Sequence, residues 1–295
     1  MSSLLVKVKS KMSIHAHHKV RGLLEGQYGS VFKGRSMDFD DLREYIPGDD
    51  IKDIDWNATA RSGQTRVKRY VAVRKHNILF VVDTGKNMAA TASSGEPKRD
   101  IAIMATGILG HIAQKHGDLV ALVAGNDAAT RYMPLKASSS HLERMLQYIN
   151  GESKLDAPGS NMGRQLEYIA RSIRRRMMLI IVADDMAISA NDERLLRRLG
   201  AQHEIMWLTV GDIDMTAKEY LGDDMFDVES SKTLPVFIRG NKQLQTEFAA
   251  ATTKRRQEAK RMLDRLNIAS ERITAEADVM RGIFALLERQ RRAKR

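Results

Sequence analysis

The sequence predicts an α/β fold in which helices cover both faces of a mostly parallel β-sheet. Short apolar runs such as Ile78–Val82 and Met177–Ala183 have the length of strands and show no alternation, as expected for strands buried on both faces. Segments with helical periodicity, such as Lys98–His116, lie between these runs. The 295 residues are 43% hydrophobic and 29% charged, which suits a globular protein with a sizeable core.

The remaining elements of the sheet region follow the same alternation. Further strands are expected at Asp118–Ala124, Arg131–Leu135 and Glu204–Val210. Further helices are expected at Ser138–Ile149, Gly163–Arg175 and Asp192–Leu199. Repeated β-α alternation indicates parallel strands joined by right-handed crossovers.

The chain divides into three stretches at the level of sequence: residues 1–76, 77–240 and 241–295. The first has no long periodic pattern and is interrupted by glycines that predict turns. Within it we expect short helical turns at Asp40–Tyr45 and Ile51–Arg61, and a strand at Gln64–Arg74. The third stretch is expected to be helical, with a break at Asn267–Ser270 and apolar stripes that pack on the sheet.

Composition narrows the functional classes. The chain has no cysteine, which excludes disulfides, zinc–thiolate sites and thiol nucleophiles. No apolar run is long enough to cross a bilayer and the N-terminus has no secretory apolar block, so we expect a cytoplasmic protein. The net charge is +11, and residues 241–295 hold 14 basic and 7 acidic side chains. Nucleic-acid binding is one interpretation of this tail, but a solvated helix face is favoured because the charges alternate.

Oxygen-bearing side chains follow the first core strand, at Asp83-Thr84-Gly85-Lys86-Asn87. The spacing resembles the D-x-S-x-S metal-ion-dependent adhesion motif of von Willebrand factor A domains, in which oxygen ligands surround Mg²⁺. The resemblance implies two further loops. Ser160 stands where the family has a threonine, and Asp184 follows the next buried strand. The predicted metal ligands are therefore Asp83, Asn87, Ser160 and Asp184.

This loop departs from the motif in three ways. Gly85 has no ligand where the family has its first serine, and Asn87 replaces the second. Lys86 could place an ammonium near the carboxylates and displace a cation. The alternative interpretation is that Asp83 only caps the following segment, because a shared fold does not establish a working site.

The longest motif of the chain precedes the sheet. Its matching residues are Arg43, Tyr45, Pro47, Gly48, Asp49, Asp50, Ile54, Asp55, Trp56, Thr59, Ala60 and Arg61, followed by Asp83, Thr84 and Met88. This pattern resembles the domain of unknown function 58 family. The resemblance implies a von Willebrand factor A-like, Rossmann-like domain with an N-terminal extension. It also implies a partner, because such proteins are typically encoded beside MoxR-type AAA+ ATPases and are thought to serve them as adaptors.

The motif has a structural interpretation that needs no ligand. Pro47-Gly48 suits a tight turn, and Asp49 and Asp50 suit the start of a helix. Asp55 and Arg61 are expected to pair, and Trp56 is expected to anchor the extension in the core. The competing interpretation uses Asp49, Asp50, Asp53 and Asp55 as catalytic or metal-binding carboxylates.

We therefore expect a non-enzymatic adaptor, without catalytic residues, that docks at the sheet edge with or without Mg²⁺. The first alternative is a basic nucleic-acid-binding protein, whose affinity would fall steeply with salt. The second is a metal-dependent hydrolase that uses the acidic cluster before the sheet. It lacks a recognisable nucleophile or histidine partner.

Overall fold

The computed structural model describes residues 3–15, 18–31, 38–71, 75–185, 188–213, 228 and 241–293. The chain forms two compact units. We call Phe32–His76 the small unit, and Met1–Val31 together with Asn77–Arg295 the sheet unit. The sequence predicted that all of residues 1–76 form one extension, whereas the first 31 residues belong to the sheet unit.

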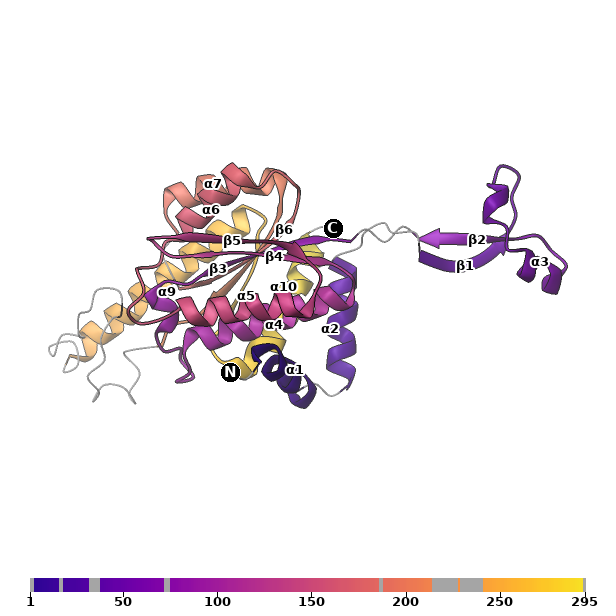
Figure 1. Ribbon diagram of the computed structural model, residues 1–295. Helices are drawn as coiled ribbons and strands as arrows, with labels where there is room; N and C mark the ends of the chain where they lie inside the picture. Colours follow the sequence, from indigo (N-terminus) through magenta and orange to yellow (C-terminus); the bar gives the residue numbers. More distant parts are fainter. Residues whose placement is uncertain are drawn as a thin grey trace. The chain divides into compact units, whose positions relative to one another are not determined.

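A six-stranded sheet in the order β5-β4-β3-β6-β7-β8 forms the centre of the sheet unit (Figure 1). Its strands are β3 (Asn77–Asp83), β4 (Leu119–Gly125), β5 (Thr130–Lys136), β6 (Met178–Asp184), β7 (Glu204–Val210) and β8 (Ala269–Ile273). Only β5 runs antiparallel to its neighbour, and the other pairs are parallel. The predicted α/β class and mostly parallel sheet are confirmed, and this is the strand order of doubly wound folds.

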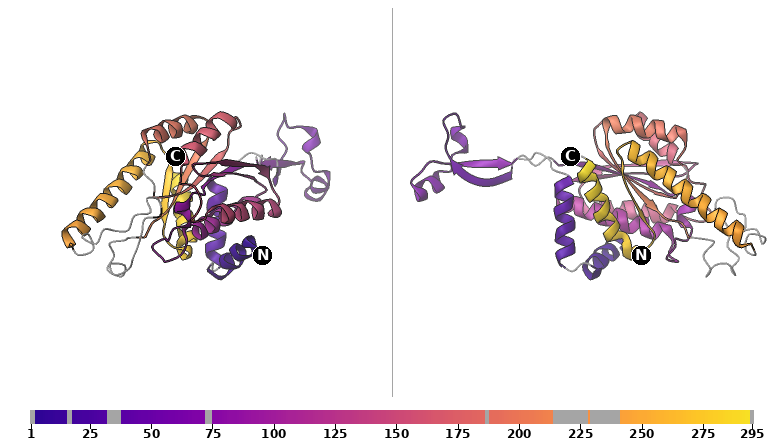
Figure 2. Two further views of the ribbon diagram at one scale, coloured as in Figure 1. Left: turned by 60° about the vertical axis from the view of Figure 1, so that its left-hand side comes forward. Right: turned by 180° about the vertical axis from the view of Figure 1, so that it is seen from behind.

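Helices cover both faces of this sheet (Figure 2). One face carries α6 (Met162–Ser172), α7 (Ala190–Gln202) and α9 (Lys242–Arg265), whose apolar residues share a core cluster with the strands. The other face carries α4 (Lys98–Lys115) and α5 (Ser139–Glu152), with α1 (Leu4–His15), α2 (His18–Val31) and α10 (Val279–Ala293) packed around them. The apolar run Ile78–Val82 is fully buried between the two layers. Each such side chain contributes about 1.5–3 kcal/mol to folding.

The two N-terminal helices were not predicted. Gly22 and Gly26 lie inside α2, so the interpretation of these glycines as turns was wrong. The helix buries Leu24, Tyr28 and Val31 at helical spacing. No atom lies within 4 Å of a Cβ added at Gly22 or Gly26. Packing of the apolar face outweighs the roughly 1 kcal/mol that each glycine costs a helix.

The C-terminal stretch was predicted to be helical apart from a break at Asn267–Ser270, and no strand was predicted in it. Ala269–Ile273 forms β8, which pairs in parallel with β7. The expected break is real, since Asn267 adopts a left-handed backbone with φ of 55°. The five residues of β8 do not alternate between apolar and polar side chains, so the sequence carried no strand pattern there.

The small unit contains a two-stranded antiparallel sheet of β1 (Asp38–Glu44) and β2 (Arg66–Val71). Between them lie the 3-10 helix η1 (Ile51–Asp53) and the helix α3 (Trp56–Ser62). The predicted strand at Gln64–Arg74 is present as β2, although residues 72–74 lie outside the described part of the chain. The helical segment predicted at Ile51–Arg61 is present as η1 and α3. The predicted helical turn at Asp40–Tyr45 was wrong, because pairing with β2 holds this segment extended.

Candidate functional site at the carboxyl edge of the sheet

Two carboxylates end adjacent strands at the centre of the sheet. Asp83 is the last residue of β3 and Asp184 the last residue of β6, and these strands pair in parallel. Chain connections run in opposite directions on the two sides of this pair, so it is the switch point at which doubly wound folds bind ligands. Asp83 is completely buried, and Asp184 is 5% exposed. The predicted placement of both residues at one edge is confirmed.

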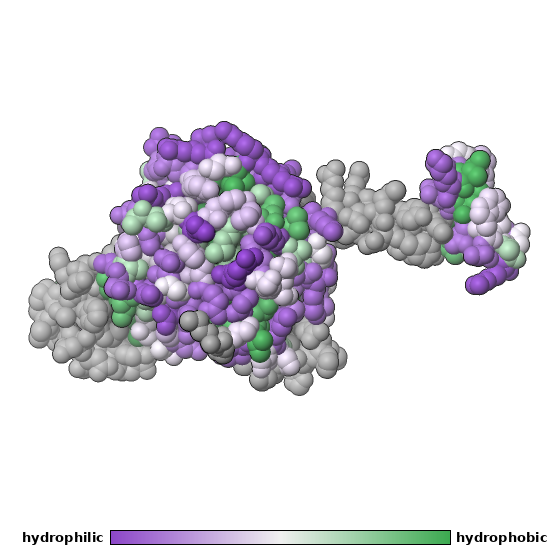
Figure 3. Space-filling view, viewed as in Figure 1, coloured by the Kyte–Doolittle hydropathy of each residue, from purple (hydrophilic) through white to green (hydrophobic). Residues whose placement is uncertain are grey.

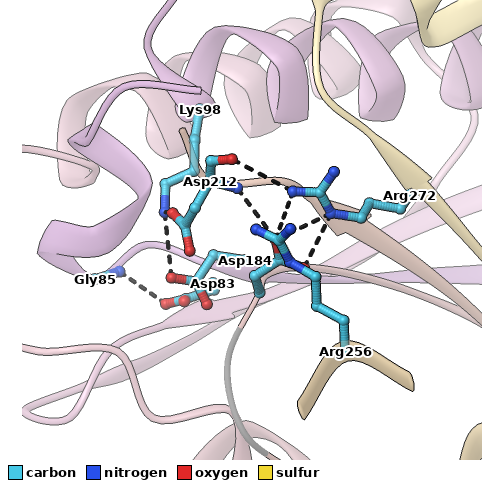
Figure 4. Close-up of polar contacts among 8 residues, drawn as sticks. Asp83, Gly85, Lys98, Asp184, Asp212, Arg256 and Arg272 are labelled. Atoms are coloured by element: carbon cyan, nitrogen blue, oxygen red, sulfur yellow. Dashed lines mark hydrogen bonds and ion pairs between the residues drawn. The ribbon is translucent and has the colours of Figure 1, made fainter. Parts of the chain in front are cut away.

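A lysine provides the positive charge at this edge (Figure 4). Lys98, the first residue of α4, is 1% exposed. Its Nζ lies 3.3 Å from Oδ2 of Asp184 and also donates to Oδ1 of Asp212, which follows β7. The ammonium therefore bridges two carboxylates from neighbouring strands.

A second layer of charges lies beside this bridge. Asp185 accepts hydrogen bonds from Nη2 of Arg272 at 2.7 Å and from Nε of Arg256 at 3.1 Å. Arg272 belongs to β8, and Arg256 belongs to α9. Nη2 of Arg272 also donates to the backbone oxygen of Asp212 at 3.3 Å. We call these seven residues the edge cluster: Asp83, Lys98, Asp184, Asp185, Asp212, Arg256 and Arg272.

Burial shifts the proton affinities of this cluster. It raises the pKa of Asp184 to about 7 against the attraction of the Lys98 ammonium, and the charges of Asp83 and Asp212 add to the rise. Burial alone would lower the pKa of Lys98, but Asp184 and Asp212 outweigh it and raise that pKa above its usual value. Lys98 therefore stays a cation at neutral pH.

The predicted metal ligands lie around the same edge. Oδ1 of Asp83 accepts a hydrogen bond from the Gly85 N–H at 2.8 Å, as the capping interpretation predicted. Asn87 is buried in the 3-10 helix η2 (Lys86–Ala89). Ser160 lies before α6 in a loop that joins the Asp83 loop through a bond from the Lys86 N–H to the Pro158 oxygen at 3.0 Å.

Gly85 is required by this close approach of the two loops. A Cβ at residue 85 would lie 2.5 Å from Oγ and 2.6 Å from both Cα and N of Ser160. Real Cβ atoms do not come so close to backbone atoms, so a side chain here would force the loops apart. The serine ligand of the metal motif is therefore sterically excluded as well as absent from the sequence.

The site fits an unassisted Mg²⁺ poorly. Buried oxygens do favour a ligand, since Ser160 Oγ and Asp184 Oδ1 have no hydrogen-bond partner among the described residues, at a cost of about 1–3 kcal/mol each. Against them, a divalent ion about 4 Å from the Lys98 ammonium would be repelled by roughly 8 kcal/mol at an effective dielectric constant of 20. Among the residues described, no three His, Asp or Glu side chains converge as metal ligands do. The predicted magnesium site stays a prediction that a titration tests.

Sequence reasoning missed four members of the edge cluster entirely. They come from four different segments of the chain and meet only through tertiary packing: Lys98, Asp212, Arg256 and Arg272. The sequence indicated that Lys86 could displace the cation, whereas the lysine that contacts the carboxylates is Lys98. The one available signal was the position of Lys98 in the first turn of a helix, where the helix dipole disfavours a cation.

The motif residues of the small unit stabilise its backbone. Arg43 forms a bidentate ion pair with Asp49 at 2.7 and 2.5 Å, which lowers the pKa of Asp49. Asp50 caps η1, and Asp55 caps α3 by accepting from the Asn57 and Ala58 N–H groups. Pro47 and Gly48 form the expected turn, in which Gly48 has a φ of 110°. The turn and the two caps match the structural interpretation of the motif, whereas Asp49 pairs with Arg43. The predicted pairing of Asp55 with Arg61 stays a prediction.

Trp56 does not serve as the predicted anchor, because its residue is 65% exposed. Tyr45, Ile46 and Ile51 of the same unit are also exposed, and Arg61 at the end of α3 faces solvent. Hydrophobic residues are visible on the surface of the small unit in Figure 3. Four of the six exposed large hydrophobic residues described lie in this short segment, which marks it as an interaction surface.

An open cleft of about 490 Å³ lies at the carboxyl edge of the sheet, between the first turns of α6 and α7. Its walls include Arg164, Glu167, Asn191 and Trp207, and Ser160 and Ala183 connect it to the edge cluster. A mixed lining of charged, amide and aromatic groups can receive a polar side chain from a partner protein.

The strand order, the single antiparallel strand and the carboxylates at the switch point define a von Willebrand factor A-like α/β domain. The family model described as "Protein of unknown function DUF58" matches residues 41–258. The chain therefore belongs to this family, as its motif predicted.

Several known proteins are similar to this chain. "Uncharacterized protein Rv1480" of Mycobacterium tuberculosis is 27% identical over 256 residues, which cover 85% of this chain and 79% of the relative. A von Willebrand factor type A structure from Catenulispora acidiphila is 11% identical at a TM-score of 0.42, covering 74% of this chain and 43% of that one. An aerotolerance-related membrane protein from Bacteroides fragilis is 12% identical at a TM-score of 0.44, covering 72% of this chain and 98% of that one. None of the helices described in this chain is long and apolar enough to span a membrane.

Proposed function

We propose that this chain is a non-enzymatic protein-interaction module that docks a partner at the carboxyl edge of its sheet. The cleft beside the edge cluster carries this proposal. It is open, lined by charged, amide and aromatic groups, and lies where doubly wound folds bind ligands. The exposed apolar residues of the small unit support an interaction function independently.

The proposed partner is an AAA+ ATPase of the MoxR type, for which this chain acts as an adaptor. This part of the proposal rests on family membership, because proteins with this motif are typically encoded beside such ATPases. Mass action then predicts that the partner also stabilises the folded chain when it binds.

The basic tail supports the interaction proposal over nucleic-acid binding. Its exposed cations form ion pairs along their own helices, as in Arg292 with Glu288 at 2.6 Å and Lys260 with Asp264 at 3.2 Å. A cation that is paired with a carboxylate on its own helix is partly neutralised, so it attracts a nucleic-acid phosphate less strongly.

Binding between the purified chain and a purified MoxR-type ATPase from the same genome tests the proposal. Asn191→Trp places a bulky ring in the cleft and is expected to weaken binding at least tenfold. Arg198→Trp, on the exposed side of the same helix, is the matched control and is expected to leave binding unchanged. Equal affinities for wild type and both variants would contradict docking at the cleft. No binding by wild type would contradict the partner.

A further inference from the structure

We infer that the Lys98 ammonium is the resident cation of the edge cluster and takes the place of a divalent metal. The ammonium bridges Asp184 and Asp212, and Asp83 lies close enough to influence the charge of Asp184. In the adhesion motif, the aspartates at the positions of Asp83 and Asp184 hold the ion. This chain therefore keeps the negative half of such a site and supplies the positive half from its own sequence.

The backbone fixes Lys98 in this position. The Lys98 N–H donates to the Ala90 oxygen at 2.9 Å, which ties the start of α4 to the end of the Asp83 loop. A bridge between Thr91 and Pro97 closes the intervening turn. Because α4 is buried along most of its length, packing holds the backbone of Lys98 beside the edge cluster.

Charge balance supports the same assignment. The edge cluster contains four carboxylates and three cationic side chains, so the protein itself neutralises nearly all of the charge. A bare metal site needs an excess of negative charge, because the ion supplies two positive charges of its own. Here the arginines hold Asp185, and the lysine holds Asp184 and Asp212.

The loops also fit a metal-free site. Gly85 lets the backbone of Ser160 lie against the Asp83 loop, in space that a serine ligand would occupy. If the proposed docking at this edge is correct, docking is then independent of divalent ions and proceeds in EDTA. The inference itself concerns the cation alone, so its test needs no partner.

The inference is tested by titrating the full-length protein with Mn²⁺ and measuring the free ion by its electron paramagnetic resonance signal. Mn²⁺ prefers the same oxygen ligands as Mg²⁺. Wild type and Asp184→Asn are expected to bind the same amount of Mn²⁺, because the edge holds none in either protein. One additional equivalent bound by wild type would overturn the inference. Asp83→Asn gives the same comparison if the first variant does not fold.

A gain of function provides the second arm. Lys98→Ser removes the ammonium, leaves a hydroxyl in the space, and is expected to gain about one equivalent of bound Mn²⁺. The gain should disappear in Lys98→Ser combined with Asp184→Asn. Lys98→Arg keeps the positive charge and is expected to gain nothing. If Lys98→Ser folds but binds no more Mn²⁺ than wild type, the inference that Lys98 occupies a metal position is contradicted.

Discussion

The side chains of Asp184 and Asp185 in the sheet unit are buried and paired with cations, whereas Asp50 and Asp55 of the small unit cap backbone N–H groups near solvent. Asp184 is 5% exposed and lies 3.3 Å from the Lys98 ammonium, and Asp55 accepts hydrogen bonds from the N–H groups of Asn57 and Ala58. The same side chain therefore has two functions, and burial decides between them. A buried carboxylate needs a counter-charge from elsewhere in the chain, while an exposed one stabilises the turn beside it.

Removal of the buried cation should have the largest effect. Lys98→Met leaves Asp184 buried without its counter-ion, and we expect a loss of about 3–5 kcal/mol in the free energy of unfolding. Urea denaturation measures this loss. Lys260→Met, which removes an exposed pair within one helix, is the control and should cost less than about 1 kcal/mol. Equal costs for the two variants would show that the buried bridge has no special role.

The free energy of unfolding should depend on pH through the buried Asp184 of the sheet unit. The pKa of Asp184 is about 7 in the folded chain, above the ordinary 3.8, so folding favours its protonated form. Its contribution is fully present below about pH 4 and is lost as the pH rises to 7, by on the order of 4 kcal/mol. The unfolding free energy of wild type relative to Asp184→Asn should therefore fall over this range. A difference that is constant with pH would contradict the raised pKa.

Restoring the motif serine should destabilise the sheet unit. Gly85→Ser places a Cβ against Ser160, and we expect a cost of about 1–3 kcal/mol in thermal or urea unfolding. Adding Ser160→Gly should not rescue it, because the clash includes the backbone atoms of residue 160. Full rescue would show that only the serine side chain opposes the change.

Loss of a cap in the small unit should have the smallest effect. Asp55→Ala removes the acceptor for two N–H groups of α3, at a cost of about 1 kcal/mol. Hydrogen exchange at the Asn57 and Ala58 amides should become faster. Asn57→Ala, an exposed change in the same helix, is the control. Unchanged exchange in the Asp55 variant would contradict the capping role.

The sequence predicted the parts of the site that local patterns determine. The apolar run Ile78–Val82 specified a buried strand, and parallel strands bring Asp83 and Asp184 to one edge. It did not predict the convergence of four other members of the edge cluster, because this depends on how α4, the end of β7, α9 and β8 pack together. These members are Lys98, Asp212, Arg256 and Arg272. The exposure of Trp56 was unpredictable for a similar reason, since burial of a ring depends on how the surrounding elements pack.

The central claim is that Lys98 occupies the position of a metal ion, and crystals soaked in Mn²⁺ test it most directly. Anomalous scattering at the manganese edge locates the ion without reference to any model of the site. We expect no anomalous peak within coordination distance of Asp83 or Asp184, and the Lys98 ammonium between Asp184 and Asp212. A peak bound to those carboxylates, with Lys98 turned away, would contradict the account.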